Sequence, residues 1–533
     1  MKKFSSIERS QNLNKFKNEI FDLVIVGGGI NGAGIARDAS SRGMKVALIE
    51  ANDFASGTSS RSSKLIHGGI RYLENLEFKL VFEALNERSI LFEIAPHLVH
   101  PLKFMIPLFK ASRVGMFKMG LGMWLYDILS LFQTPELHER LTATQTLSLQ
   151  EQVKSKDLLG SFVYYDAYMD DDRLVHETLR SANENKAIIA NYVSAKEYSY
   201  EESIHKIKAI DTLTGQSFEI KSHQMISCVG PWTDFFAKIT DDKWENLLRP
   251  TKGIHLILKR QRFNLHQAVV MGAETGNRII FGIPRGEFVI IGTTDTDYPM
   301  NPSTVHTELA DVEYLLKIVN SYFPNEKIEK ADIVASYSGV RPLVHDKAQS
   351  TGKTSREHTI KSGKNGIIYV AGGKYTTYRK IAEEAVDRLL EDLSIEQRVL
   401  FSKSNTHSPL NPLVTSESYR NYLSVQVSKE DFKLAELLGP EAEVLKHEYP
   451  DYTNLQKIVA FHIDNTMCIS IADFYLRRSH LMLTLKDHGL SQFDEIAMVF
   501  RDKLDANEEF IQSEKEKIQK HINSEMGWMV LNQ

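Results

Sequence analysis

Three glycines and one acid near the start of the chain have the spacing of a dinucleotide-binding turn. An apolar run leads into Gly27, Gly29 and Gly32 in the pattern Gly-x-Gly-x-x-Gly, and Glu50 follows about 20 residues later. The first glycine permits a tight turn, the second lets the backbone approach a pyrophosphate, and the third lets helix and strand pack closely. A helix from Asn31 would present N–H groups to the phosphates, and Glu50 would accept ribose hydroxyl hydrogens. These residues predict a dinucleotide site.

A second polar stretch, from Gly57 to Lys64, favours FAD over NAD as that dinucleotide. It contains five hydroxyl side chains and two cations. A cofactor that stays bound through every turnover can be enclosed by such a loop, whereas a cofactor that is exchanged usually is not. We therefore expect cofactor contacts from Thr58, Ser59, Ser62 and Lys64. The alternative is a serine-rich loop that is simply solvated.

Beyond this loop the chain resembles the FAD-dependent, quinone-linked glycerol-3-phosphate dehydrogenase family. The resemblance lies in motifs at 65–74, 170–175, 230–232, 252–255, 291–295, 337–343 and 372–380. The motifs follow the family order from about residue 20 to about residue 385, and the likeness is thin beyond residue 400. The breadth of the match, rather than any single motif, makes the resemblance specific.

The resemblance implies that the chain oxidises sn-glycerol 3-phosphate to dihydroxyacetone phosphate by hydride transfer to FAD. Such chemistry needs an anion site, and Arg71, Arg341 and Lys374 follow glycines in the matching motifs. Arginine suits bidentate phosphate binding, while lysine acts as a point charge. Arg356 is similar to another anion-site position, and Tyr72 would add a hydroxyl donor. Arg341 and Lys374 would also stabilise a developing alkoxide.

The general base has two candidates. His255 lies on an expected strand, and the ordinary pKa of histidine, near 6.5, suits proton abstraction at neutral pH. The alternative for His255 is a structural strand histidine. His67 is the rival base, although it would instead pack beside the flavin if His255 is the base. The acids Asp170 to Asp172 are expected to cap a helix that starts near Arg173 rather than to act in catalysis.

The family resemblance also implies further contacts with the cofactor. The start of a helix at 374–376 would offer N–H groups to the flavin C2 carbonyl. The remaining implied cofactor-binding residues are His67, Gly230, Gly373, Lys374 and Thr376. The family commonly has Asn-Ala-Thr-Gly before Pro-Trp, whereas this chain has Ser227-Cys228-Val229-Gly230. This departure puts contacts on the adenosine side in doubt.

The predicted fold is α/β, with a doubly wound FAD-binding domain like those of glutathione reductase and amino-acid oxidases. We assign 1–20 to an N-terminal extension, and 21–100, 166–244 and 361–395 to the FAD-binding domain. A β-sheet substrate-binding domain would comprise 101–165 and 245–360, with strands near 254–258, 278–281 and 288–291. Pro409 and Pro412 suggest a linker, and 410–533 would form a helical C-terminal domain.

Composition places the chain among ordinary globular proteins. At 533 residues it exceeds the size at which one core stops growing, so two or three domains are expected. The net charge of −5 gives no nucleic-acid signature, and Cys228 and Cys468 form no metal-ligand or disulfide pattern. The first 20 residues lack an apolar core, so no signal peptide is expected. No apolar run reaches the roughly 18–20 residues that span a bilayer.

The electron acceptor is left open by the residues alone. Segment 103–132 mixes four cations with bulky apolar residues, which suggests an interfacial segment or, equally, a buried methionine-rich helix. The family resemblance favours a membrane quinone, an anionic membrane surface and a peripheral place on the inner face of the cytoplasmic membrane, and it implies a homodimer. A soluble oxidase that uses oxygen is the competing enzyme, although the insertion typical of such oxidases is missing.

Two further alternatives come from other classes of flavoprotein. One is an amine or amino-acid oxidase with a related two-domain plan. The other is a flavoprotein binding module or RNA-modification factor. The motifs that contain Arg71, Arg341 and Lys374 count against it, and the sequence has no basic patch interleaved with aromatic residues.

Overall fold

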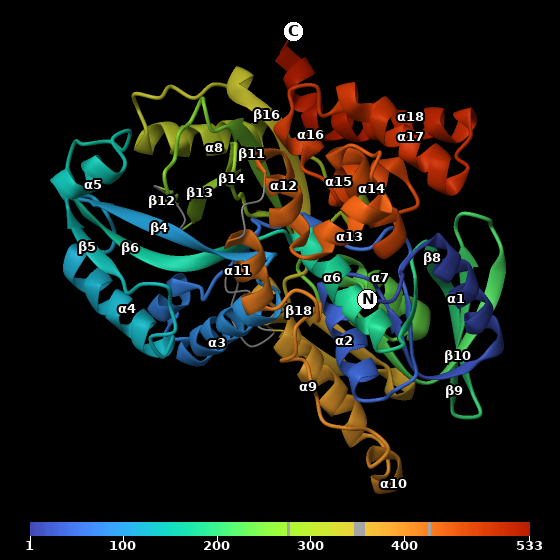
Figure 1. Cartoon of the computed structure of the whole chain (residues 1–533). Helices are drawn as coiled ribbons and strands as arrows, with labels where there is room; N and C mark the ends of the chain where they lie inside the picture. The colour runs from blue at the N-terminus through green and yellow to red at the C-terminus, as the bar shows by residue number, and fades with distance from the viewer. Residues whose placement is uncertain (274–277, 346–357, 425–427, 533) are drawn as a thin grey trace.

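Two large sheets form the frame of the molecule in the computed structural model, which describes residues 1–273, 278–345, 358–424 and 428–532 (Figure 1). The sheet that holds the dinucleotide turn, sheet A, has the strand order β17-β18-β10-β1-β2-β7, with β8 and β9 attached through β10. Its strands are β1 Ile20–Val26, β2 Val46–Ile49, β7 Ile188–Ala190, β8 Val193–Glu201, β9 Ile204–Asp211, β10 Ser217–Ser227, β17 His358–Ser362 and β18 Ile368–Gly372.

Sheet A is the predicted doubly wound unit. Strand β1 pairs in parallel with β2 on one side and β10 on the other, and β10 pairs in parallel with β18. Helices α2 (Ile30–Ser41), α6 (Asp171–Glu184) and α9 (Tyr378–Glu391) pack together along it. Strands covered on both faces need continuous apolar runs, which is why the residues before Gly27 are buried almost without interruption.

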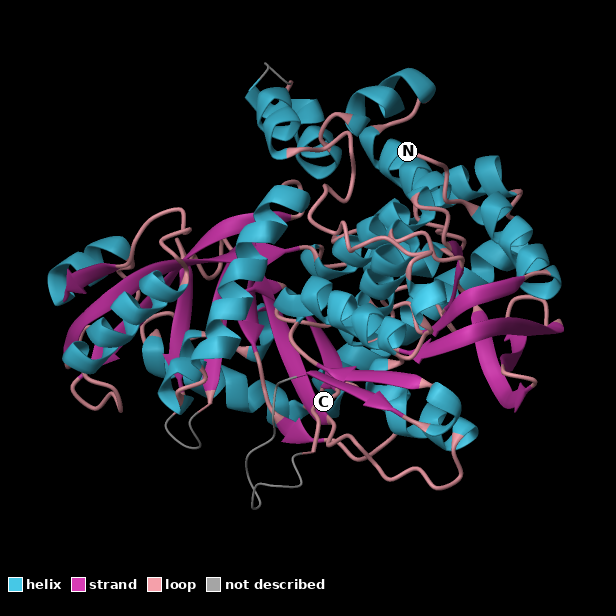
Figure 2. Ribbon diagram, turned by 90° about the horizontal axis from the view of Figure 1, so that it is seen from below, coloured by secondary structure: helices cyan, strands magenta, loops and turns pink. Residues whose placement is uncertain are grey.

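The second sheet, sheet B, is almost entirely antiparallel. Its strands are β3 Leu65–Ile66, β4 Val99–Phe109, β5 Glu139–Thr142, β6 Leu158–Met169, β11 Thr251–Lys259, β12 Ala268–Gly272, β13 Ile279–Arg285, β14 Phe288–Gly292, β15 Thr296–Asp297 and β16 Ile333–Arg341. Helix α8 (Leu309–Tyr322), which the sequence did not lead us to expect, packs near β12. Figure 2 shows this sheet extending away from the helix-rich part of the molecule.

The C-terminal region is helical, as predicted. Its helices are α11 Ser416–Ser424, α12 Lys429–Leu438, α13 Glu441–Glu448, α14 Asn454–Asn465, α15 Ile471–Arg477, α16 Leu481–Thr484, α17 Phe493–Leu504 and α18 Glu508–Met526. They lie along one side of the molecule, shown in orange and red in Figure 1. A core of its own holds α14, α15, α17 and α18 together, and α18 also contacts strand β16 of sheet B.

The first 20 residues are not a detached extension. Helix α1 (Ser6–Asn18) follows a serine cap and buries Phe16 in the core of sheet A. Arg9 Nη2 donates to Asp211 Oδ1 at 2.7 Å, and Asn12 Nδ2 donates to the Ile189 carbonyl at 2.9 Å. The short strand β3, which lies within 21–100, joins sheet B.

Segment 103–132 comprises the end of a strand and one helix. Its first part belongs to β4, where Phe104 and Met105 are buried in two different hydrophobic clusters. Helix α4 (Met116–Leu129) follows, with α3 (Phe78–Ile94) beside it, and exposes Phe117 and Trp124. Over the described part of the chain, none of the helices combines the length and the apolar character needed to cross a bilayer.

Candidate functional site

The dinucleotide turn is closed to side chains at the positions that the motif predicts. Gly27 has φ of +112°, and a Cβ on Gly32 would lie 1.9 Å from the Gly27 carbonyl oxygen. A Cβ on Gly29 would lie 3.1 Å from Ser59 Oγ, which also accepts a hydrogen bond from Ile30 N at 3.0 Å. The serine-rich loop therefore packs directly on the start of helix α2, as a second wall of the predicted cofactor site.

Glu50 stands at the end of β2, beside the turn. Its Oε2 accepts from Gly28 N at 2.7 Å, and its Oε1 accepts from Asn52 N at 2.9 Å. Burial raises the pKa of Glu50, while these two backbone donors act in the opposite direction. Since each carboxylate oxygen has further lone pairs, the side chain is held in place and can still accept from a ribose hydroxyl.

A cavity of about 470 Å³ opens beside this turn. Its lining includes the predicted cofactor residues Gly27, Gly29, Asn31, Glu50, Thr58, Ser59, Ser62, Gly230, Gly373 and Lys374. Cys228 and Trp232 line it too, so the unusual stretch before Pro231 keeps the expected backbone course. A concave site with glycine walls, a helix N-terminus and one carboxylate has the groups that would hold the pyrophosphate and ribose of FAD.

A second cavity, of about 280 Å³, adjoins the first. The two share Thr58, Ser62, Pro342, Gly372, Gly373, Lys374 and Tyr375. The second cavity is also lined by the predicted residues His67, Arg71, Tyr72, His255, Arg341 and Thr376. Residues more than 300 positions apart in the sequence thus meet at Lys374, where a flavin ring in the first cavity would face a substrate in the second.

Glycines make room for the cations of the second cavity. A Cβ on Gly253 would lie 2.3 Å from Arg341 Nη2, so the guanidinium packs directly on the backbone of strand β11 at this glycine. Arg341 Nη2 donates to Thr293 Oγ1 at 2.8 Å. Lys374 Nζ lies 3.8 Å from the centre of the Tyr72 ring. Arg71 is exposed at the cavity rim.

His255 is enclosed on three sides within the second cavity. Its Nε2 lies 2.8 Å from Ser63 Oγ, and its ring stacks on Tyr337 at 4.6 Å between centroids. A Cβ on Gly292, which pairs with His255 across the sheet, would lie 2.2 Å from the imidazole. Burial, aided by the charges of Arg341 and Lys64, holds the pKa of His255 well below its usual value. The side chain is therefore neutral near pH 7, as a proton acceptor must be.

His67, the rival base, is placed differently. Its backbone N donates to Thr376 Oγ1 at 3.1 Å, and the same hydroxyl is 3.3 Å from the His67 carbonyl. These contacts fix the strand end of β3 against the Lys374-Tyr375-Thr376 segment, where both cavities meet. Helix α9 begins at Tyr378 after a short 3₁₀ turn, slightly later than the predicted helix start.

The side chain of Lys64 is paired with acids at the start of helix α6. The Lys64 ammonium forms a buried ion pair with Asp171, and this carboxylate and Asp172 raise the pKa of Lys64 although burial opposes them. Its side chain lines neither of the two cavities, so a cofactor contact from Lys64 stays a prediction. The acids do occupy the start of helix α6, as expected. Arg356 lies outside the described residues.

Several site residues were not identified from the sequence. Thr293, Ser63 and Tyr337 hold Arg341 and His255 in place. Thr293 and Tyr337 lie in motifs that carried the family resemblance, which was the available signal, whereas Ser63 was placed only in the phosphate-suited loop. Gly253 and Gly292 could have been found as glycines within apolar strands, since an isolated strand glycine often marks a close approach.

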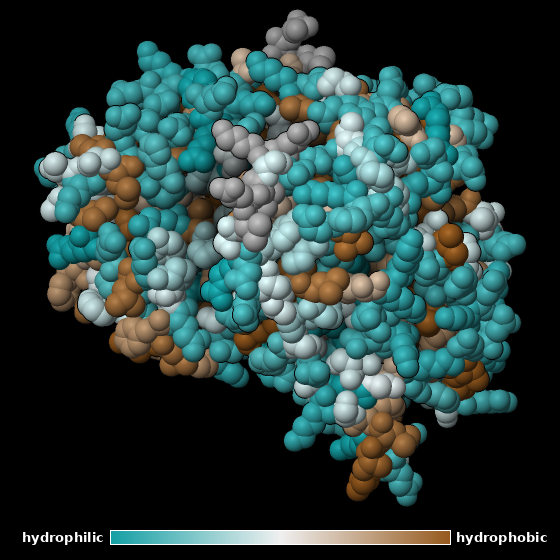
Figure 3. Space-filling view, in the orientation of Figure 1, coloured by the Kyte–Doolittle hydropathy of each residue, from teal (hydrophilic) through white to brown (hydrophobic). Residues whose placement is uncertain are grey.

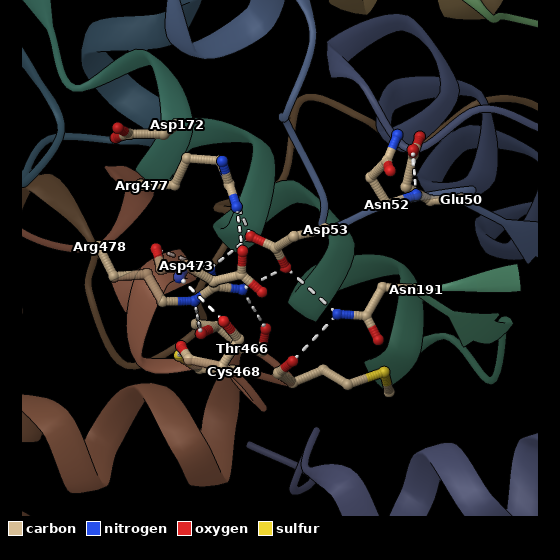
Figure 4. Close-up of polar contacts among 12 residues, drawn as sticks. Glu50, Asn52, Asp53, Asp172, Asn191, Thr466, Cys468, Asp473, Arg477 and Arg478 are labelled. Atoms are coloured by element: carbon tan, nitrogen blue, oxygen red, sulfur yellow. Dashed lines mark hydrogen bonds and ion pairs between the residues drawn. The ribbon is translucent and has the colours of Figure 1, made fainter. Parts of the chain in front are cut away.

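A buried ion cluster behind the cofactor turn was also missed. Asp53 Oδ2 accepts from Arg477 Nε at 2.7 Å and from Arg478 Nη1 at 2.6 Å, and Asp53 Oδ1 accepts from Asn191 Nδ2 at 3.2 Å (Figure 4). Although burial alone would raise the pKa of Asp53, Arg478 and Arg477 lower it below its usual range. The C-terminal helices are thereby fastened to the segment that follows Glu50.

Comparisons with known proteins agree with this geometry. Residues 22–379 match the family model described as FAD dependent oxidoreductase, DAO. The chain is 34% identical, over 550 aligned positions, to the aerobic glycerol-3-phosphate dehydrogenase of Staphylococcus haemolyticus (strain JCSC1435), covering 97% of this chain and 96% of that protein. The corresponding protein of Staphylococcus aureus (strain bovine RF122 / ET3-1) is 34% identical over 541 positions, with 97% of each chain covered.

Solved structures give the same result. The glycerol-3-phosphate dehydrogenase from Bacillus halodurans, complexed with FAD, has a TM-score of 0.77 at 27% identity and covers 98% of both chains. The L-alpha-glycerophosphate oxidase from Mycoplasma pneumoniae, with a TM-score of 0.57 at 20% identity over 72% of this chain and 97% of its own, shares the fold. The chain therefore belongs to the FAD-dependent oxidoreductases and, among them, to the glycerol-3-phosphate dehydrogenase family.

Proposed function

We propose that this chain oxidises sn-glycerol 3-phosphate to dihydroxyacetone phosphate. The observation that carries the proposal is the meeting of a cofactor cavity with a cation-lined cavity at Lys374. The names of the relatives that are 34% identical to it support this substrate. Bound FAD supplies the two-electron acceptor for the reaction.

The cations divide the binding of the substrate between them. Arg341 and Lys374 lie at the inner part of the cavity, and Arg71 lies at its rim. Arg71, with Arg356 as a further candidate, binds the phosphate, and Tyr72 adds a hydroxyl donor. Arg341 and Lys374 stabilise the oxygen on C2 as its proton leaves, because preorganised positive charge favours a developing alkoxide.

His255 takes the C2 hydroxyl proton. Its burial keeps the imidazole neutral, and Nε2 lies 2.8 Å from the hydroxyl of Ser63, which also lines the substrate cavity. A neutral imidazole has one protonated and one free nitrogen, so it can accept a proton from a bound hydroxyl. His67 remains the second candidate for this role because it lines the same cavity.

Flavin bleaching tests the proposal. The purified, FAD-loaded chain is mixed anaerobically with sn-glycerol 3-phosphate, glycerol or a set of amino acids, and the flavin absorbance is followed. Rapid bleaching by glycerol 3-phosphate alone supports the proposal. Bleaching by an amino acid but not by glycerol 3-phosphate would instead indicate an amino-acid oxidase, a class that shares this fold.

We further propose a membrane quinone as the electron acceptor, with the enzyme bound peripherally to the cytoplasmic face of an anionic membrane, as a homodimer. Helix α4 is the observation that supports binding to a membrane surface. Its residues Phe117, Leu121 and Trp124 are more than half exposed, and Lys118 lies among them. Brown atoms gather over this part of the molecule at the lower left of Figure 3. The substrate cavity is also lined by Phe104, Val270, Ile279 and Phe281, apolar groups that a three-carbon phosphate does not need.

Vesicle binding and acceptor choice test this second part. The protein should co-sediment with anionic vesicles, and the double variant Phe117→Ser, Trp124→Ser should stay in solution while its anaerobic flavin reduction is unchanged. Val444→Ser with Met498→Ser, which alters exposed residues on the C-terminal helices, is the matched control. If the wild type ignores vesicles and turns over fastest with oxygen, the chain is a soluble oxidase. Light scattering of the purified protein tests the homodimer.

A further inference from the structure

Strand β16 ends inside the substrate cavity, but its other face is held by the C-terminal helix α18. Tyr337 of this strand stacks on His255, and Arg341 at its end enters the cavity. Between them, Ser338 is fully buried. The position of this short segment therefore sets both the imidazole and the guanidinium of the proposed site.

Glu525, on the last turn of α18, is the main contact at the back of the strand. Its Oε1 accepts from Ser338 Oγ at 2.8 Å and from Ser338 N at 3.3 Å, and its Oε2 accepts from Thr307 Oγ1 at 3.1 Å. The Glu525 side chain is buried, and burial raises its pKa even though Arg61 and these donors oppose the rise. Charged acceptors with several donors fix geometry more firmly than neutral ones.

Arg61 links the same carboxylate to the cofactor loop. Its Nη1 donates to the Ser338 carbonyl at 3.0 Å and lies 3.6 Å from Glu525 Oε1. A Cβ on Gly339 would lie 2.8 Å from Arg61 Cβ, so loop and strand are in close contact. Neighbouring bonds tie the two further: Thr58 Oγ1 donates to the Val340 carbonyl at 2.6 Å.

Glu525 thus touches the strand of the substrate site and, through Arg61, the loop of the cofactor site. The Tyr337 hydroxyl, which donates to the Ser62 carbonyl at 2.8 Å, closes the link between them. We propose that Glu525 is a positioning residue, by which the C-terminal helical region holds strand β16 and the cofactor loop at the distance that the reaction requires. The proposal rests on the proposed function.

The test is rapid-mixing flavin reduction by saturating glycerol 3-phosphate in the FAD-loaded fraction of each variant. Glu525→Ala removes the contact at the back of Ser338, and a misplacement of about 1 Å far from the chemistry can cost roughly 100-fold, so we expect a fall of about 10- to 100-fold. Glu525→Gln keeps the acceptor toward Ser338 and should recover most of the rate. If Glu525→Ala does not fold, Ser338→Ala removes the same bond from the other side.

Glu514 offers a matched control on the same helix. It is a fully buried glutamate that accepts from Ser470 Oγ and from Ala472 N, inside the C-terminal region. Glu514→Ala should lower the melting temperature but leave the reduction rate of loaded enzyme unchanged. The positioning role is wrong if the flavin of Glu525→Ala is also reduced at the wild-type rate. If Glu525→Ala cannot be isolated, the role is wrong when Glu525→Gln and Ser338→Ala both match the wild type.

The two proposals fail in different ways. If glycerol 3-phosphate does not reduce the wild-type flavin, the proposed function is wrong, and the role of Glu525 in that reaction falls with it. If glycerol 3-phosphate reduces the wild-type flavin, and the Glu525 variants, like the Glu514 control, lose stability but keep the reduction rate, the proposed function stands and only the positioning role is wrong.

Discussion

The two cavities that meet at Lys374 are built in opposite ways. The turn beside the cofactor cavity comes from one continuous stretch of glycine backbone and a helix N-terminus, to which small hydroxyl side chains and glycines from the ends of β10 and β18 are added. The cation cavity takes side chains from sheet B, from the loop after β3 and from the segment after β18. The first depends on the absence of side chains and the second on their presence. Mutations should therefore separate cofactor retention from turnover.

The largest effect is expected in the turn. Gly32→Ala places a methyl group 1.9 Å from the Gly27 carbonyl oxygen, which only a shift of the backbone can relieve. The purified variant should be colourless, as measured by flavin absorbance per protein. Gly122→Ala, where an added Cβ meets nothing within 4 Å, should remain yellow. A Gly32→Ala protein with full FAD content would contradict the assignment of the turn.

Replacing the proposed base should have the next largest effect. Removing a general base typically costs about 10²- to 10⁴-fold, so His255→Ala should slow flavin reduction by that factor while FAD content stays normal. Rapid mixing with glycerol 3-phosphate measures the rate constant. If His255→Ala is nearly as fast as wild type and a His67 variant is slow, His67 rather than His255 is the base.

Loss of one cation should cost less. Arg341→Ala removes a charge-assisted contact with the substrate, worth roughly 1.5–3 kcal/mol or about 10- to 150-fold in kcat/KM. Because Arg341 borders only the cation cavity, FAD content should not change. Loss of flavin from this variant would show that the two cavities are not separable. Steady-state kinetics and absorbance of the same sample give both values.

The smallest effect is expected from pH. An exposed histidine base would lose activity about tenfold per pH unit below its pKa near 6.5. His255 has a pKa held well below that value by burial and by nearby positive charge, so it stays neutral as the pH falls through 6.5. The reduction rate constant at saturating substrate should therefore be flat from pH 6 to 8. An inflection near 6.5 that disappears in a His255 variant would contradict this.

The cofactor half of the site could be predicted from the sequence because it is local. The spacing of Gly27, Gly29, Gly32 and Glu50 is set by one strand, one turn and one helix, and β-strand and helix periods carry that information. The doubly wound sheet and the helical C-terminal region followed from the same patterns and from the family resemblance.

For the cation cavity, the sequence predicts which residues take part but not how they are arranged. That Arg341 packs on Gly253, or that Tyr337 stacks on His255, depends on the antiparallel register of β11 and β16, which no local pattern specifies. The ion pair of Lys64 could not be predicted for a related reason. Its loop position suited a phosphate, but the folded chain brings Asp171 to it from a distant helix, and a buried ammonium needs a partner.

The ion cluster of Asp53 has a consequence for biosynthesis. Asp53 and its partner Arg477 are 424 residues apart. At a translation rate of about 5–20 residues per second, roughly 20–85 s pass before the arginines that neutralise this buried carboxylate exist. Until then the segment after Glu50 lacks the ion pairs that hold it in its final place. We therefore expect ribosome-bound chains halted before Arg477 to take up FAD poorly, so that the newly made polypeptide becomes a flavoprotein only near the end of its synthesis.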